Sequence, residues 1–234
     1  MSRRNEMPNI ARIGALIGNP MRARMIGSLM DGSERSASAL AKEVGATAQA
    51  VSAHLSNLVT GGLLAVRAEG RQRWYRIRSE QVAEAIEVLS RTAVDAMPEM
   101  NFAHEIRCAR RCYDHVAGRL GVALCEYALK RRYVVADDAG ATLTAAGSAW
   151  LERLELPAPA GLRRPLVRLC LDWTERRWHL AGWLGAALCR QLEDGRTVRR
   201  IEGSRALVVT PVGRTVLKRR FSLDWSAIER RDAR

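Results

Sequence analysis

The sequence has few aromatic residues and no long apolar run. Aromatics make up 5% of the 234 residues, and six of the twelve are Trp. No stretch reaches the roughly 18 consecutive apolar residues of a membrane helix. The N-terminal segment MSRRNEMPNI also lacks the apolar core of a secretory signal peptide. We therefore expect a cytoplasmic protein with no membrane partner.

A disulfide framework and the common enzyme motifs are missing from the sequence. The five Cys are an odd number without the spacing of a disulfide framework, which indicates reduced thiols. The sequence has no phosphate-binding P-loop, no G-x-S-x-G nucleophile motif and no Gly-rich dinucleotide motif. We therefore expect no catalytic residues and no enzymatic activity.

Acidic residues are fewer than basic ones. The sequence has 25 Asp and Glu against 38 Lys and Arg, which gives a net charge of +13. Residues 1–100 contribute 13 − 10 = +3 and the remainder contributes 25 − 15 = +10. A polyanionic partner such as nucleic acid would explain the excess. Almost all the basic residues are Arg, so the composition bias of a GC-rich genome is an alternative explanation for the C-terminal half.

One helix with two different faces is predicted over residues 47–60. Val51, Leu55 and Leu58 recur at helical spacing and point towards a core. The opposite face carries only small or polar residues, which suits a helix that enters a groove. The hydroxyl of Thr47 can cap the first turn of this helix.

A basic hairpin is predicted to follow, with Arg71 and Arg73 near its tip at Gly70. A small-faced helix followed by a basic hairpin is typical of a winged helix-turn-helix, in which the helix enters the major groove and the wing contacts the backbone or minor groove. Gln49 could pair with adenine. The expected DNA contacts are Thr47, Gln49, Ala50, Ser52, Ala53, Ser56, Asn57, Arg71 and Arg73.

Residues 9–97 resemble a known family. Further helices are predicted over residues 9–18, 20–30, 36–44 and 79–97. Together with GNPMR at 18–22, Ser52-x-His54-Leu55, Gly61-Gly62-Leu63 and Glu69-Gly70-Arg71, they resemble the ArsR/SmtB repressors. The resemblance implies a homodimer packed through its first and last helices, binding to a double-stranded DNA operator, and release by a small effector. The helix 36–44 has no Cys and the helix 79–97 has no His, so neither usual metal site of the family carries over.

The remaining sequence contains an internal duplication. HVAGRLGVALC at 115–125 matches HLAGWLGAALC at 179–189 in eight of eleven positions, and LTAAG at 143–147 corresponds to VTPVG at 209–213. We therefore predict a mostly α fold with small β-wings, in which a winged helix-turn-helix precedes two tandem winged-helix-like repeats. The predicted domains are residues 1–98, 99–156 and 157–234.

A helix from about residue 101 would place His104, Cys108, Cys112 and His115 on one face. Thiolate and imidazole suit zinc, copper or a metalloid, although one straight helix cannot surround an ion. Closure would require Cys170, Cys189 or a residue of a partner subunit. A thiol switch for oxidants or electrophiles, or an inert packing face with free thiols, are the alternatives.

A group of Trp residues forms a second candidate effector site. Trp173, Trp178 and Trp183 lie close together in the sequence, and Trp150 could join them around an apolar pocket. The alternative is that these residues only fill the core.

The overall hypothesis is an ArsR-type repressor that leaves its operator when the C-terminal region binds an effector. A regulator of the same fold could instead sense an oxidant, an electrophile or an apolar small molecule. A ligand-binding or protein-interaction module that does not contact DNA is the alternative from another class.

Overall fold

The structure is a computed structural model that describes residues 10–96, 102–137 and 140–230. The chain divides into two compact units, Met1–Ile86 and Glu87–Arg234, which we call the N-terminal and C-terminal units. The division falls inside the helix α5 (Glu80–Ala96). The sequence had instead predicted boundaries after residues 98 and 156. None of the helices in the described ranges combines the length and apolar composition of a bilayer span.

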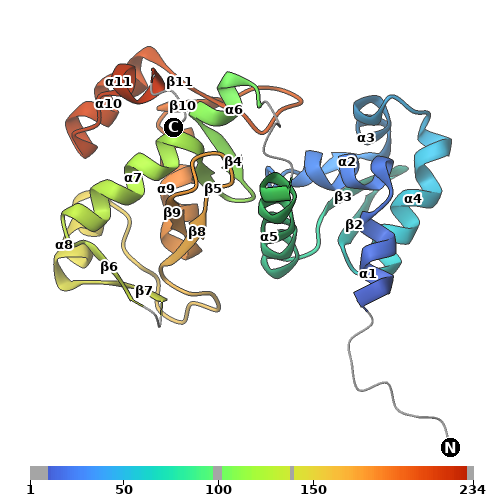
Figure 1. Cartoon of the computed structure of the whole chain (residues 1–234), viewed down its shortest axis with the longest axis horizontal. Helices are drawn as coiled ribbons and strands as arrows, with labels where there is room; N and C mark the ends of the chain where they lie inside the picture. Colours follow the sequence, from blue (N-terminus) through green and yellow to red (C-terminus); the bar gives the residue numbers. More distant parts are fainter. Residues whose placement is uncertain (1–9, 97–101, 138–139, 231–234) are drawn as a thin grey trace, which may run out of the picture. The chain divides into compact units, whose positions relative to one another are not determined.

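The N-terminal unit contains the helices and strands of a winged helix-turn-helix (Figure 1). The three short strands form one antiparallel sheet in the order β1-β3-β2. The strands β2 and β3 form the wing. The elements are α1 (Ile10–Ile17), α2 (Pro20–Leu29), β1 (Arg35–Ser36), α3 (Ala37–Val44), α4 (Ala48–Thr60), β2 (Leu64–Glu69) and β3 (Gln72–Ile77).

Local sequence signals explain where these helices begin and end. The hydroxyl of Thr47 accepts a hydrogen bond of 3.1 Å from the Ala50 backbone N–H and caps α4. Gly45 ends α3 in the left-handed region at φ 69°, which favours glycine. Val51, Leu55 and Leu58 are each 0% exposed. The predicted two-faced helix is therefore confirmed, as are the helices around it. The predicted helix ends at Asn9 and Met97 lie outside the described residues.

The C-terminal unit begins with the second half of α5 and the short helix α6 (His104–Cys108). Two sets of elements in the same order follow, each a hairpin, a helix, a second hairpin and a helix. The first set is β4 (Arg110–Cys112), β5 (His115–Ala117), α7 (Gly118–Lys130), β6 (Val134–Asp137), β7 (Gly140–Leu143) and α8 (Ala145–Arg153). The second set is β8 (Arg168–Leu171), β9 (Trp178–Ala181), α9 (Gly182–Asp194), β10 (Val198–Arg200), β11 (Leu207–Val209) and α10 (Pro211–Phe221), and α11 (Trp225–Glu229) follows it.

The two sets repeat details as well as order. Both α7 and α9 have 13 residues and begin at a glycine with positive φ, Gly118 at 73° and Gly182 at 72°. Thr144 and Thr210 cap the last helix of each set by accepting from the backbone N–H groups of Gly147 and Gly213. The duplication seen in the sequence therefore extends to the fold.

The two repeats do not form separate domains, because they share one hydrophobic core. Leu120 and Leu124 of α7 belong to the same buried cluster as Leu184 and Leu188 of α9. Moreover, α7 contacts β9 and α9 contacts β5, so the hairpin of each repeat packs on the helix of the other. Each repeat therefore needs the other to bury its apolar residues, which explains why the chain divides only once.

The predicted continuous helix through residues 104–115 is wrong. α6 ends at Cys108, and residues 110–117 form the β4–β5 hairpin with Tyr113 in its turn at φ 60°. Two residues separated by three positions share a face in a helix, but they also lie opposite each other across a two-residue turn. The spacing between Cys112 and His115 fits both structures, so periodicity alone could not distinguish them.

Candidate functional site

The outer surface of α4 and the wing tip hold all nine residues predicted to contact DNA. Each of the nine is exposed. The inner face of α4 is completely buried in the same unit, so the helix presents its small and polar face outward. A groove of about 450 Å³ between α4 and the wing brings together Ser52, Ser56 and Arg73.

The arginines of the wing differ in their neighbours. Arg67 forms ion pairs with Glu34 at 3.1 Å and with Glu69 at 2.8 Å. Within the described ranges, neither Arg71 nor Arg73 has an ion pair. Acidic neighbours therefore neutralise one wing arginine, while the two at the tip keep their charge available for a phosphate group.

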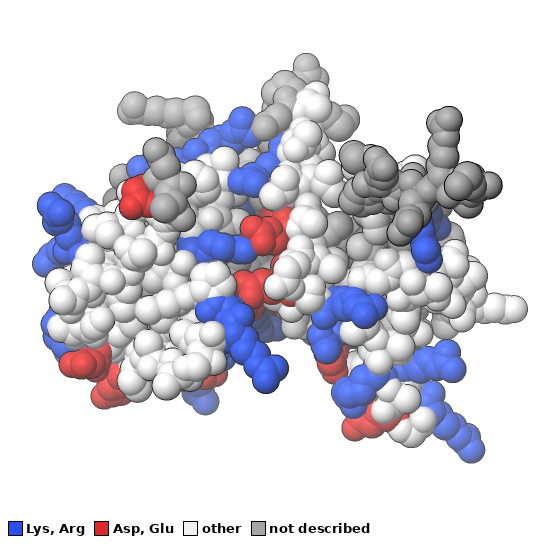
Figure 2. Space-filling view, turned by 90° about the horizontal axis from the view of Figure 1, so that it is seen from below, with Lys and Arg blue, Asp and Glu red and all other residues white. Residues whose placement is uncertain are grey.

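Basic and acidic side chains are mixed on the face shown in Figure 2. Lys and Arg side chains lie there in several groups, with Asp and Glu side chains among them. Within the C-terminal unit, several arginines face inward: Arg110 is 0% exposed, and Arg111 and Arg119 are also buried. Part of the +10 charge of the C-terminal half is therefore structural.

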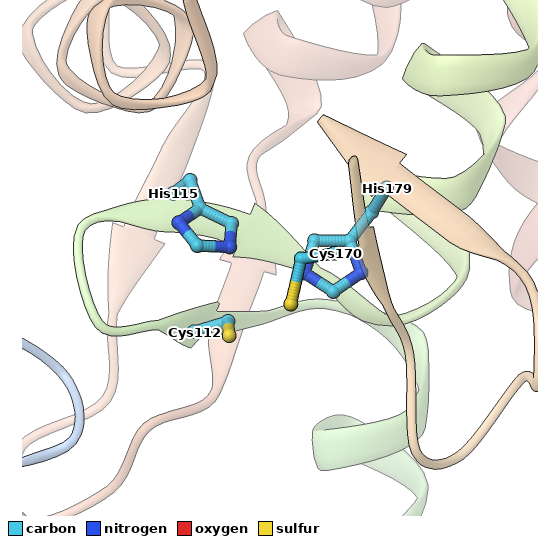
Figure 3. Close-up of side chains that lie close together, drawn as sticks. All are labelled: Cys112, His115, Cys170 and His179. Carbon is cyan, nitrogen blue, oxygen red and sulfur yellow. The ribbon is translucent and has the colours of Figure 1, made fainter. Parts of the chain in front are cut away.

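Four cysteine and histidine side chains meet inside the C-terminal unit (Figure 3). Cys112 and His115 lie opposite each other on the β4–β5 hairpin, and Cys170 and His179 lie opposite each other on β8–β9. One nitrogen or sulfur atom from each residue lies within 4.8 Å of the other three. The two imidazole rings are 5.1 Å apart between centroids. We call these four residues the Cys/His cluster.

An aspartate lies near the Nδ1 atom of each histidine of the cluster. The Nδ1 atom of His115 is hydrogen-bonded to Asp114 Oδ1 at 3.0 Å, and Arg164 contacts the other oxygen of Asp114 at 2.6 Å. The Nδ1 atom of His179 lies 3.6 Å from Asp172 Oδ2. Within the part of the chain that the structure describes, the Nε2 atoms of both histidines and the Nδ1 atom of His179 are buried without a hydrogen-bond partner.

The cluster strongly perturbs the ionisation of its own groups. Burial alone would lower the pKa of His115, but the neighbouring Cys112 sulfur and the hydrogen bond with Asp114 raise it to about 9. A hydrogen bond with Cys170 and burial raise the pKa of Cys112 well above its usual range. The Cys112 thiol therefore favours its protonated form, and the His115 imidazole favours its charged form.

The other half of the predicted stripe lies elsewhere. His104 Nε2 is 3.2 Å from Cys108 Sγ on α6, and Cys108 also lies 3.8 Å from the Glu229 carbonyl oxygen. Burial raises the pKa of the Cys108 thiol. His104 and Cys108 are therefore a local pair, and the structure does not bring all four predicted residues together.

The four predicted pocket tryptophans are also separate. Trp150 stacks on Tyr133 at 4.9 Å, and the Arg110 guanidinium lies 3.9 Å above Trp173. Trp178 is 48% exposed. Of the four, Trp183 lines a groove of about 780 Å³ that also includes Leu156 and Phe221. The expected four-tryptophan pocket is therefore not formed, because two of these rings pack into other parts of the core.

Sequence reasoning named Cys170 only as one of several closing residues, and it missed His179. The duplication contained the signal, since aligning the two copies of H-x-A-G-x-L-G-x-A-L-C places His179 on His115. If one repeat places a histidine in a site shared by the two repeats, the other repeat is expected to place the equivalent histidine there. Cys170 has no such signal, because its hairpin has a longer loop than the one after Cys112.

Comparison with known proteins supports the assignment of the N-terminal unit as a helix-turn-helix domain. A family model described as a helix-turn-helix domain matches residues 17–67. The chain is 32% identical over 222 residues to an uncharacterised HTH-type transcriptional regulator, YdfF of Bacillus subtilis, and the match covers 92% of this chain and 98% of that protein. The chain belongs to the HTH-type transcriptional regulators. The match continues past the helix-turn-helix, so the regulator shares its C-terminal unit with this relative.

Other similarities are confined to part of the regulator. It is 31% identical over 97 residues to the HTH-type transcriptional regulator Rv0324 of Mycobacterium tuberculosis, a match that covers 42% of each protein. It is similar to the solved homodimeric winged helix-turn-helix domain of Mb0332 from Mycobacterium bovis, described as a possible ArsR-family regulator. That match has 28% identity and a TM-score of 0.38, and covers 44% of the regulator and 100% of the solved chain.

Proposed function

We propose that the regulator is a dimeric repressor that binds operator DNA through α4 and the wing. In this proposal it leaves the operator when its C-terminal unit binds an effector. The division of α4 into a buried apolar face and an exposed small face supports the DNA contact most directly. A helix that needed its outer face for packing would carry larger apolar residues there.

The proposed contacts divide between sequence reading and affinity. Gln49 lies on the first turn of α4, the part that contacts base edges in helix-turn-helix proteins, and its amide can pair with adenine. Arg71 and Arg73 supply charge for phosphate groups from the wing. A second copy of the chain would supply the other half-site at a spacing of about 34–36 Å.

Exposed apolar side chains support the dimer. Ile10 of α1 is 69% exposed and Ile13 is 38% exposed, and Val88 and Leu89 of α5 are 43% and 45% exposed. Each helix thus leaves apolar surface uncovered, and a second copy of this chain would cover it. Light scattering should find a dimer that Ile10→Asp with Ile13→Asp converts to a monomer. A wild-type monomer at micromolar concentration would contradict the dimer.

A mobility-shift titration on the DNA upstream of the regulator's own gene tests the DNA contact. Gln49→Ala should weaken binding to this DNA by about tenfold, since a good bidentate base contact is worth about 1–3 kcal/mol. Arg71→Ala with Arg73→Ala should weaken binding to all sequences and reduce the slope of log K against log salt by about 2.

Arg67→Ala is the matched control, because Glu34 and Glu69 already neutralise this wing arginine. It should leave the salt slope close to the wild-type value. Unchanged binding in the Gln49 and Arg71/Arg73 variants would rule out the proposed surface. Absence of binding by the wild type would favour the alternative of a protein-interaction module.

The proposed release is a shift between two dimer states. An effector can shift this equilibrium only if it binds more tightly to the state whose two α4 helices do not fit successive major grooves. The effector should therefore weaken the affinity for DNA, and DNA should weaken the affinity for the effector by the same factor.

A further inference from the structure

We propose that the Cys/His cluster is a binding site for one divalent transition-metal ion of the zinc class. Its ligands would be the sulfur atoms of Cys112 and Cys170 and the Nε2 atoms of His115 and His179. The inference concerns the C-terminal unit alone and does not depend on DNA binding.

The spacing of the four side chains suits a single ion. In a tetrahedral zinc site with two sulfur and two nitrogen ligands, the ligand atoms lie about 3.3–3.8 Å apart. Here the four candidate atoms already lie within 4.8 Å of one another. A contraction of about 1 Å would complete the coordination. A two-iron cluster divides its ligands between two metal atoms and would hold them farther apart, so the cluster fits one ion.

Both imidazoles direct the same atom, Nε2, towards the centre of the cluster (Figure 3). In each ring Nδ1 faces an aspartate, at 3.0 Å for Asp114 and 3.6 Å for Asp172. Among the described residues, Nε2 of each ring is buried and has no hydrogen-bond partner, and Nδ1 of His179 also lacks one at 3.6 Å from Asp172. Histidines that bind metals commonly direct the other ring nitrogen towards a carboxylate, which fixes the ring and raises its basicity. Two buried nitrogens without partners are costly in a core unless a ligand satisfies them.

The charges in and around the cluster favour a divalent ion. Binding would release one proton from each thiol and one from the His115 imidazolium, so that two thiolates and one M²⁺ sum to zero with neutral imidazoles. The two aspartates are already balanced, since Asp114 pairs with Arg164 and Asp172 pairs with Arg110. A site with no net charge can be buried at low cost, whereas a monovalent ion would leave one negative charge uncompensated.

The two repeats contribute equally to the site. Each supplies one cysteine and one histidine from neighbouring strands, and each histidine packs on the helix of the other repeat. A Cβ atom at Gly121 of α7 would lie 3.3 Å from the His179 Cβ atom, and a Cβ atom at Gly185 of α9 would lie 3.1 Å from the His115 Cβ atom. A bound ion would therefore connect the two repeats, and its removal should loosen the C-terminal unit as a whole.

Metal content and the cobalt spectrum test the site directly. The full-length regulator purified under reducing conditions should contain one zinc ion per chain by elemental analysis. Protein stripped with a chelator should bind one equivalent of Co²⁺, with the intense visible bands of a tetrahedral ion and a thiolate-to-cobalt charge-transfer band. Zn²⁺ should displace the cobalt and raise the melting temperature of the stripped protein.

Substitutions distinguish this ligand set from the stripe predicted from the sequence. Cys112→Ser with Cys170→Ser should reduce bound metal to less than one tenth of an equivalent, and His179→Ala should remove the tetrahedral spectrum. Cys108→Ala, Cys125→Ala and Cys189→Ala should each retain one equivalent, because these thiols lie outside the cluster. Gln49→Ala, which tests DNA binding, should also retain the ion.

Three results would overturn the proposal. One is a full equivalent of metal in the Cys112/Cys170 variant. Another is a wild-type cobalt spectrum that lacks the thiolate charge-transfer band, a measurement that remains decisive if the variants fail to fold. The third is a protein that binds neither Zn²⁺ nor Co²⁺ and forms a Cys112–Cys170 disulfide on mild oxidation, which would make the cluster a thiol switch.

Discussion

The two units of the regulator place their polar groups in opposite ways. In the N-terminal unit, the residues proposed for function lie on the surface of α4 and the wing. In the C-terminal unit, Arg110, Asp172 and His179 are each at most 1% exposed, and His115 is also buried. One unit is arranged to contact something outside itself, and the other is arranged around a polar interior.

This difference determines what a substitution can report. A change on the outer face of α4 should remove a proposed contact with DNA and leave the core intact, so binding should change with little effect on stability. A change in the polar interior of the C-terminal unit removes a partner from a buried group, so stability and ligand binding should change together.

The largest effect is expected for Arg110→Ala. The Arg110 guanidinium is completely buried, pairs with Asp172 at 3.0 Å and donates to Thr174 Oγ1 at 3.0 Å. Its removal leaves a buried carboxylate without its cation, which costs about 3–5 kcal/mol of unfolding free energy. Urea denaturation of the full chain checks this value.

The exposed ion pairs of Arg67 provide the contrast. Arg67→Ala should leave the unfolding free energy close to the wild-type value, because exposed pairs contribute little. If Arg110→Ala and Arg67→Ala lowered the unfolding free energy equally, the buried polar groups would matter no more for stability than the exposed ones. That result would contradict the difference drawn between the two units.

The next largest effect is expected for Gly185→Ala. The new Cβ atom would lie 2.3 Å from the Leu180 carbonyl oxygen and 3.1 Å from the His115 Cβ atom. Relieving these contacts requires a backbone shift, which should cost about 3 kcal/mol and weaken metal binding by moving His115. Thermal unfolding and cobalt titration check the two effects.

Gly27→Ala is the matched control in the N-terminal unit. Gly27 lies within α2, and a Cβ atom there would meet nothing within 4 Å. Alanine should stabilise this helix by about 0.5–1 kcal/mol, since it removes the entropic cost of glycine. Destabilisation by both substitutions would mean that the helix backbone at Gly185 is no more crowded than the one at Gly27.

The sequence predicted the N-terminal unit well because its signals are local. The apolar spacing of Val51, Leu55 and Leu58, the cap at Thr47 and the glycines between the elements all act within a few residues. Each of these signals survives in the structure, and the exposure of Gln49 and Arg71 follows from them.

The C-terminal site could be predicted only in part, because its geometry depends on pairing between distant residues. The spacing from Cys112 to His115 fits a helix as well as a two-residue hairpin, and it was interpreted as a helix. Nothing near Cys170 indicates that its strand reaches residues 58 positions earlier in the chain. The duplication, by contrast, could have identified His179 from its match to His115.

A smaller effect, confined to the affinity for metal, is expected for Asp114→Asn. Asp114 accepts the Nδ1–H of His115, and the neutral amide would make the imidazole a weaker ligand. Loss of such a carboxylate partner typically weakens metal binding by about 10–100-fold. Competition with a chromogenic chelator measures this change. Asp194→Asn, at the exposed end of α9, should leave the affinity unchanged, and an equal loss in both variants would point to a general effect of charge.

The smallest effects compare helix caps in the two units. Thr47 Oγ1 accepts one hydrogen bond, from Ala50 N–H, whereas Thr210 Oγ1 accepts from Gly213 N–H and also donates to the Arg196 carbonyl oxygen at 2.7 Å. Thr47→Ala should therefore cost about 1 kcal/mol. Thr210→Ala should cost slightly more than Thr47→Ala, because it also removes the exposed hydrogen bond to the Arg196 carbonyl oxygen.

Hydrogen exchange of peptides from α4 and α10 can measure the two costs separately, since each reports on the unit that contains it. Thr→Ser at each position keeps the hydroxyl and should restore most of the protection. If Thr47→Ala proved as costly as Thr210→Ala, the N-terminal unit would depend on its capping hydroxyls as strongly as the C-terminal unit does. The contrast between an outward-facing and an inward-facing polar arrangement would then hold for function but not for stability.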